Sequence, residues 1–167
     1  LLFLFCLLSW SVLHAQKTIN RPPFIAKATE TIEIAAIHLS DTATVVDVDA
    51  KFIPKNWIRI APATCLVADN GERYQVRQGV GIELGQEFWM PESGEATFSL
   101  IFPPLPASVK SFDFVEGEGE RDFNLFGISL IGKLPKLQLP KDLGKAGKAT
   151  AVALPTPEIK EGTAIIS

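Results

Sequence analysis

Histidine and cysteine, a common general base and a common nucleophile, are scarce in this sequence. The 167 residues include two histidines and two cysteines. One of each, His14 and Cys6, falls in the apolar stretch at the start of the chain, which leaves His38 and Cys65. No C-x-x-C surrounds Cys65, no lysine or arginine stands close to it in sequence, and its apolar neighbours predict a buried, structural thiol. His38 lies in an apolar strand-like stretch, so we expect a hydrogen-bonded structural histidine.

Motifs for hydrolysis, nucleotide binding and metal binding are incomplete. Neither G-x-S-x-G nor H-E-x-x-H occurs. Residues 79–85 space their glycines as G-x-G-x-x-x-G, without the strand–helix context of a dinucleotide site. Residues 144–150 resemble a phosphate loop, but Ala149 stands where a magnesium-binding hydroxyl is needed. The E-G-E-G-E run over residues 116–120 predicts an exposed hairpin tip rather than a calcium loop. We therefore expect no catalytic residue, no metal site and no cofactor.

Aromatic side chains offer a candidate binding surface. Trp57, Trp89 and Tyr74, with Phe88 beside Trp89, could form a platform on which a sugar or a peptide stacks. The alternative, which we favour, is that these rings pack one end of the fold. Trp57, Trp89 and Tyr74 are therefore the binding residues of a second hypothesis, in which the chain binds a glycan or a peptide.

Strands must position these side chains, because apolar residues recur with a period of two from residue 24 to residue 131. Within residues 43–53, apolar side chains share one face while aspartates and a lysine share the other. Residues 95–102 repeat this pattern, and so do residues 112–114. Such alternation is typical of half-buried strands in an antiparallel sheet. The predicted inward-facing residues are Val46, Val48, Ala50, Phe52, Ala96, Phe98, Leu100, Phe102, Phe112 and Phe114.

Turn signals separate the strands at short intervals. Residues 40–42 predict a hairpin, and Asp-Asn-Gly at residues 69–71 predicts another, because Asn and Gly tolerate positive φ. Residues 91–94 predict a further turn. Residues 103–106 contain three prolines, which lack the N–H that a central strand needs, so they predict a connection or an edge.

The strand pattern predicts the fold class. Between residues 31 and 39 the inward parity changes, which predicts a β-bulge at Ala35–Ala36 or a strand buried on both faces. No segment shows a sustained helical stripe. We therefore predict an all-β fold over residues 16–132: an immunoglobulin-like antiparallel two-sheet β-sandwich, followed by an extended linker. A small barrel is the alternative.

The start of the chain predicts export. Residues 1–15, LLFLFCLLSWSVLHA, form an apolar run that ends in a small residue before the polar Gln16. This pattern predicts a secretory signal peptide cleaved after Ala15, in preference to a buried strand, a membrane anchor or a lipid-modified Cys6. We expect an exported protein of the periplasm or cell envelope, with no membrane span after cleavage. Residues 16–132 carry a net charge of −6, which argues against nucleic acid as a partner.

The composition changes after residue 132. Residues 133–157 contain four prolines and five lysines, which predicts a flexible, partly extended linker. Residues 158–167 alternate again and predict the first strand of a following domain that is truncated in this chain. Residues 133–167 carry a net charge of +3, opposite in sign to the body.

Two segments carry a family resemblance. F-I-P-K-N-W-I-R-I at residues 52–60 is the first, and residues 81–130 are the second, with the motifs G-I-E-L-G, M-P-x-S-G, I-F-P-P-L and F-G-I-S-L. Together they resemble the N-terminal sandwich domain of secreted bacterial thioredoxin-like multidomain proteins, the thiol–disulfide oxidoreductase and peroxiredoxin-like group. In that group a signal peptide, this domain, a linker and a second β-domain precede a thioredoxin fold with C-x-x-C. E-G-T-A-I-I-S at residues 161–167 resembles the opening of the second β-domain.

The resemblance implies a role but no chemistry for these residues. Because this chain has no C-x-x-C, no catalytic residue of the family can be assigned to it. It implies a non-catalytic N-terminal spacer or interaction module of a redox protein, whose partners are the downstream domains of the same chain and a possible protein or glycan. The alternative is an extracytoplasmic module that binds glycan or peptide through Trp57, Trp89 and Tyr74.

Overall fold

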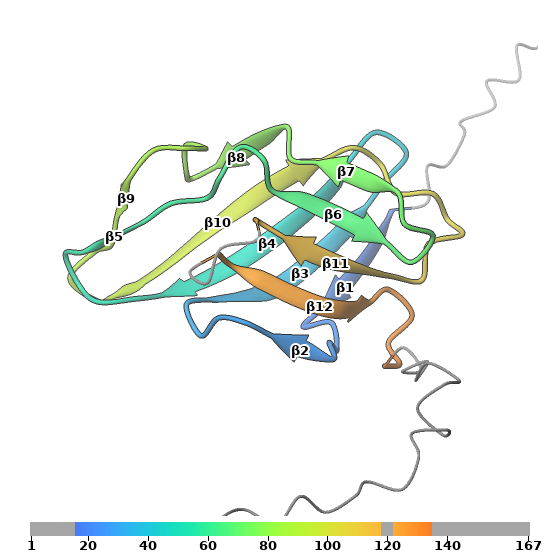
Figure 1. Cartoon of the computed structure of the whole chain (residues 1–167), viewed down its shortest axis with the longest axis horizontal. Helices are drawn as coiled ribbons and strands as arrows, with labels where there is room; N and C mark the ends of the chain where they lie inside the picture. Colours follow the sequence, from blue (N-terminus) through green and yellow to red (C-terminus); the bar gives the residue numbers. More distant parts are fainter. Residues whose placement is uncertain (1–15, 118–121, 135–167) are drawn as a thin grey trace, which may run out of the picture. The chain divides into compact units, whose positions relative to one another are not determined.

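The computed structural model describes residues 16–117 and 122–134, which belong to one compact unit built from β-strands (Figure 1). No helix occurs among these described residues. Two five-stranded sheets lie face to face, and all strand pairs in them are antiparallel. The predicted all-β antiparallel sandwich is therefore confirmed.

Each sheet has a fixed strand order. The first sheet runs in the order β1 (Lys17–Asn20), β3 (Ile32–Leu39), β4 (Thr44–Lys51), β10 (Glu95–Phe102) and β8 (Gln78–Val80). The second sheet runs in the order β2 (Ala26–Lys27), β12 (Asn124–Ser129), β11 (Ser111–Val115), β6 (Cys65–Ala68) and β7 (Arg73–Gln75). A separate two-stranded ribbon pairs β5 (Trp57–Ile58) with β9 (Phe88–Trp89).

The strand order bears on the finer classification. The order β3-β4-β10-β8 opposite β12-β11-β6 corresponds strand for strand to sheets ABED and CFG of a constant-type immunoglobulin domain. The inter-sheet disulfide of antibody domains has no counterpart among the described residues, where Cys65 is a free cysteine. An immunoglobulin-like classification rests on this strand order and stays a prediction. The strands form separate sheets, so the alternative prediction of a small barrel is wrong.

The core lies between the two sheets and is filled by the predicted alternating residues. Phe102 from the first sheet meets Phe114 from the second, with ring centroids 6.4 Å apart and an interplanar angle of 79°. This edge-to-face contact joins the two sheets within the core. Two expected members, Phe52 and Ala96, are half-buried and pack against the core. The remaining predicted members are buried: Val46, Val48, Ala50, Phe98, Leu100, Phe102, Phe112 and Phe114.

The predicted turns lie at the ends of the strands. The Ser40 N–H donates to the Ala43 carbonyl at 3.0 Å and closes the β3–β4 hairpin. The Gly71 N–H donates to Ala68 at 2.8 Å in the β6–β7 hairpin. The β3–β4 register shifts between Ile34 and Ala36, which confirms the predicted bulge. Residues 103–106 lie in the irregular connection from β10 to β11, which spans residues 103–110.

Several predictions concern segments outside the described residues. The signal peptide at residues 1–15, most of the linker at residues 133–157 and the strand at residues 158–167 all lie there. Strands occupy residues 17–129, within the predicted sandwich of residues 16–132. In the described part of the chain, no helix has the length and apolar character needed to cross a membrane.

Candidate binding site at one end of the sandwich

The β5–β9 ribbon presents two tryptophans at one end of the sandwich. Trp57 and Trp89 lie directly opposite each other in the antiparallel pair, and so do Ile58 and Phe88. Residues opposite each other point to the same side of a β-ribbon. Ile58 is buried and Phe88 packs against Phe98 at 6.4 Å between ring centroids, so that side faces the core. The two tryptophans face outward, 40% and 60% exposed respectively.

A tight turn fixes the ribbon. The Asn56 N–H donates to the Ile53 carbonyl at 3.1 Å, and the Asn56 side chain accepts from the Trp57 N–H at 2.8 Å. Lys55 adopts a left-handed backbone with φ of 60°, which is rare for a residue with a side chain. Its N–H donates to Met90 at 3.2 Å, and the Met90 N–H donates to Asn56 at 2.8 Å. The indole rings are therefore carried by a hydrogen-bonded frame.

Tyr74 lies away from this pair. It belongs to β7, which lies toward the right of Figure 1, whereas the β5–β9 ribbon lies at the left end. Its ring packs against the core, and its hydroxyl donates to Glu72. This hydrogen bond raises the pKa of Tyr74 above its usual value. The structure brings together Trp57 and Trp89 but does not bring Tyr74 to them.

A groove of about 480 Å³ runs beside Trp57. It is formed by the segment before β3, by β5 and the segments that flank it, and by Glu116, Asp122 and Phe123 between β11 and β12. Its walls combine aromatic rings, hydroxyls and charged groups of both signs. The lining residues are Ala28, Thr29, Thr31, Phe52, Trp57, Ile58, Arg59, Ala61, Glu116, Asp122 and Phe123. Trp89 is not among them.

Glu116 holds two walls of this groove together. Its carboxylate accepts from the Ala61 N–H at 2.7 Å and from the Phe123 N–H at 2.8 Å. Its own N–H donates to the Asn124 side chain at 2.9 Å. Burial raises the pKa of Glu116 above its usual value, although these two backbone hydrogen bonds oppose the shift. A buried carboxylate needs such donors, because an unpaired buried charge is costly.

The prediction of an exposed glutamate tip is therefore wrong for Glu116, which is only 8% exposed. The alternation with glycine correctly indicated a loop between two strands. It could not show that the first glutamate turns inward, because one of the two amides that bind it, that of Ala61, is 55 residues away in the chain. Residues 118–121, which include the rest of the motif, lie outside the described residues.

His38 belongs to a chain of side chains on the outer face of the first sheet. Its Nδ1 lies 3.0 Å from Thr18 Oγ1 and its Nε2 lies 2.8 Å from Asp47 Oδ2. Ser99 donates to the other Asp47 oxygen at 2.7 Å. Partial burial raises the pKa of Asp47, but hydrogen bonds from Ser99 and His38 outweigh it, and the net pKa lies below its usual value. The predicted hydrogen-bonded histidine is confirmed.

This arrangement orders a hydroxyl, an imidazole and a carboxylate as in nucleophilic catalysis. Acyl transfer also requires donors for an oxyanion and a cavity that excludes water. The four side chains instead lie on the solvent-facing side of β1, β3, β4 and β10, with the His38 side chain 44% exposed. Their contacts tie neighbouring strands together across the sheet.

Cys65 is buried, as predicted, but its surroundings differ from the prediction. Leu66 and Ala68 belong to the core cluster, whereas Cys65 does not, so its side chain lies on the outer face of β6. The Arg73 guanidinium donates to Cys65 Sγ at 3.1 Å. No cation stands close to the thiol in sequence, but the β6–β7 hairpin folds Arg73 back beside it.

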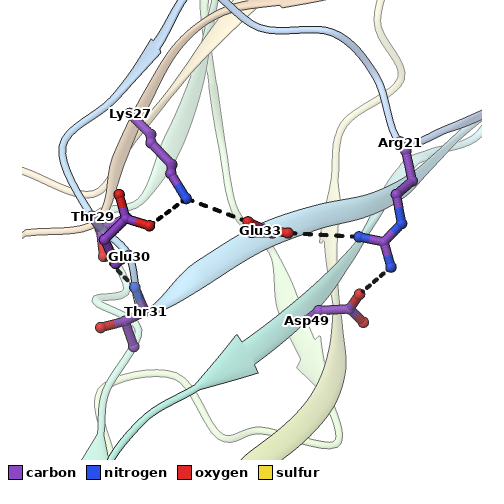
Figure 2. Close-up of polar contacts among 7 residues, drawn as sticks. All are labelled: Arg21, Lys27, Thr29, Glu30, Thr31, Glu33 and Asp49. Atoms are coloured by element: carbon purple, nitrogen blue, oxygen red, sulfur yellow. Dashed lines mark hydrogen bonds and ion pairs between the residues drawn. The ribbon is translucent and has the colours of Figure 1, made fainter.

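A ladder of ion pairs (Figure 2) lies on the first sheet. It lines part of a second groove, of about 560 Å³. Glu33 and Asp49 lie opposite each other on β3 and β4, where like charges repel. Arg21 bridges them, at 3.7 Å from Glu33 and 2.9 Å from Asp49. Lys27 lies 3.3 Å from Glu33 and 2.7 Å from Glu30. The carboxylates in this ladder are compensated, which indicates a structural role. Within the described residues, no group of three or more His, Cys, Asp or Glu could hold a metal ion.

Comparison with protein-family models, curated proteins and solved structures gives no match. The resemblance to thioredoxin-like proteins therefore rests on the sequence motifs alone. Those motifs have definite places in the fold. G-I-E-L-G follows β8, M-P-x-S-G is the turn between β9 and β10, and F-G-I-S-L ends β12.

The groove contains residues that sequence reasoning did not select. Phe52, Arg59, Asp122 and Phe123 line it together with Trp57. They come from segments about 60 residues apart, so no local spacing could group them. One local signal was available. The run from Phe52 to Arg59 holds two aromatic and two cationic side chains around a Pro-Lys-Asn turn.

Proposed function

We propose that this chain is a non-catalytic interaction module at the N-terminus of an exported, thioredoxin-like multidomain protein. The observation that supports it best is the Trp57–Trp89 pair, which faces outward from a hydrogen-bonded ribbon. Large exposed aromatic side chains on a rigid frame are typical of recognition surfaces. The module binds a partner through this end and spaces or presents the downstream domains, which carry the redox chemistry.

The gene and a longer protein test this proposal. The reading frame should continue beyond Ser167 into a second β-domain and a C-x-x-C. In that longer protein, a Trp57→Ala/Trp89→Ala double variant should weaken contact between the module and the following domains, measured by chemical cross-linking. The matched control is Val80→Ala, which removes an exposed apolar side chain from β8. Unchanged cross-linking in the double variant would contradict the proposal, as would a reading frame without C-x-x-C.

A second candidate function is extracytoplasmic binding of a glycan or a peptide. The observation that favours it is the groove beside Trp57, which joins an exposed indole to polar groups of both signs. Ligand sites commonly combine apolar walls with a few fixed polar groups in this way. In a β-sandwich, the loops at one end are well placed to build such sites.

A further inference from the structure

We infer that the groove beside Trp57 is a saccharide site, in which the Trp57 indole stacks on one sugar ring. This inference rests on the second candidate function and names its ligand class. The groove offers what a sugar requires: a flat apolar surface next to hydrogen-bonding groups of mixed character. Phe52 and Phe123 extend the apolar surface, and Thr29, Arg59 and Asp122 supply polar atoms.

The indole is placed for stacking. Trp57 is 40% exposed, and its backbone is held by Asn56 and by its pairing with Trp89. Among the described residues, nothing accepts a hydrogen bond from the Trp57 indole N–H, so this donor can meet a sugar hydroxyl. A rigid aromatic side chain loses little conformational freedom when a ligand binds.

Side chains, rather than main-chain groups, must recognise the ligand. A peptide that adds as a strand is captured chiefly through backbone hydrogen bonds. Most lining residues have their N–H already bonded within the fold. The Ala61 and Phe123 amides donate to Glu116, the Trp57 amide to Asn56, and the Thr31 amide to Thr29. The Ala28 amide donates to Asn124 and the Phe52 amide to Gly94. The groove therefore favours a saccharide over a peptide.

Charge favours a neutral ligand. The groove holds two carboxylates, Glu116 and Asp122, and one cation, Arg59. Arg59 interacts electrostatically with Glu116, and its guanidinium can also donate to the hydroxyls of a ligand in the groove. The acidic body, with a net charge of −6, opposes an anionic polymer. A neutral saccharide meets both signs of charge without leaving either in conflict.

Calorimetry on the full 167-residue chain tests the inference, with cellohexaose and chitohexaose as the sugar probes. We expect at least one of them to bind, and Trp57→Ala to weaken that binding about tenfold, as the loss of one stacking contact implies. Val80→Ala is the control, because it removes an exposed apolar side chain from β8 and Val80 does not line the groove. Arg59→Gln provides a second groove variant that leaves the ribbon intact.

The outcomes separate the two proposals. No heat from either sugar at millimolar concentration would overturn the saccharide assignment, and so would equal losses of sugar binding in Trp57→Ala and Val80→Ala. Binding of a casein-derived peptide mixture in place of the sugars would overturn it too, but would leave the binding-module function standing. If Trp57→Ala changes the far-ultraviolet circular dichroism of the protein, Arg59→Gln decides: unchanged sugar binding in that variant would contradict the groove.

Discussion

Cys65 illustrates how a contact alters a residue without giving it a function. Its thiol is only 4% exposed and accepts a hydrogen bond from Arg73. Burial limits the approach of a reagent, even though a neighbouring cation favours the reactive thiolate. We expect Ellman's reagent to label the native protein far more slowly than the urea-unfolded protein. Arg73→Ala should speed native labelling, because it removes the side chain that lies against Sγ. Rapid labelling of the unaltered native protein would contradict the structural role.

Glu116 is expected to stabilise the fold through its two backbone partners. Glu116→Ala leaves the Ala61 and Phe123 amides without an acceptor and should lower the free energy of unfolding by about 2 kcal/mol or more. Glu116→Gln keeps one acceptor oxygen and should cost less. Urea unfolding measures both. The control is Glu95→Ala, an exposed residue whose loss should change stability by about 0.5 kcal/mol or less. Equal losses in the free energy of unfolding for Glu116→Ala and Glu95→Ala would contradict this stabilising role of Glu116.

The lowered pKa of Asp47 predicts how the stability of the protein changes at acidic pH. Its pKa is lower in the folded protein than its usual 3.8, so the unfolded chain binds the proton more readily. Stability from this group is therefore present above pH 3.8 and is lost as the pH falls through the lower, folded pKa. Asp47→Asn should flatten that loss, measured by urea unfolding at a series of acidic pH values. A decline of the same slope in both proteins would exclude Asp47 as its source.

At the scale of the strands, backbone conformation decides which turns tolerate change. Gly94 has φ of +70°, and a Cβ there would lie 2.6 Å from the Phe52 carbonyl oxygen. Gly71 has φ of +86° but open space around the same position. Gly94→Ala should therefore destabilise the protein more than Gly71→Ala, by about 1 kcal/mol or more. Thermal unfolding is measured for both variants. Gly94→Ala introduces backbone strain and a steric clash, whereas Gly71→Ala introduces backbone strain alone. Equal melting temperatures would contradict the close approach.

Sequence predicted those elements whose signals are local. The β3–β4 and β6–β7 hairpins, the bulge and the inward faces of β4 and β10 follow from alternation and turn residues that lie next to each other in the chain. The β5–β9 ribbon was missed because each strand has two residues and they pair across about 30 positions. Alternation over two residues carries no information, so only the tertiary fold defines this ribbon.

The candidate site was predicted only in part, for the same reason. Trp57 and Trp89 were selected by residue type, and the ribbon does bring them together. Tyr74 was selected on the same ground, yet β7 holds it at the edge of the second sheet, away from the β5–β9 ribbon. The groove depends on segments that come together at one end of the sandwich. These segments are far apart in the sequence, so no local pattern predicts their contact.

At the scale of the whole molecule, the core is large enough to fold without the ends of the chain. Two five-stranded sheets enclose a continuous apolar cluster, and the described residues contain no disulfide that could substitute for it. Because β1 begins at residue 17 and β12 ends at residue 129, a fragment of residues 16–134 retains every described strand. This fragment should fold alone and give a β-type circular dichroism spectrum with a cooperative thermal transition.

The same fragment should show no disulfide reductase turnover. Reduction by a dithiol requires a second thiol to resolve the mixed disulfide, and residues 16–134 contain Cys65 alone. An insulin-reduction assay measures the activity, with the Cys65→Ser variant of the fragment as the matched control. The two proteins should be indistinguishable from buffer. Turnover by the fragment that disappears in Cys65→Ser would contradict a non-catalytic module, whereas a helical spectrum or a non-cooperative transition would contradict its independence. Because folding and turnover are measured on one preparation, an inactive result counts only when the fragment is folded.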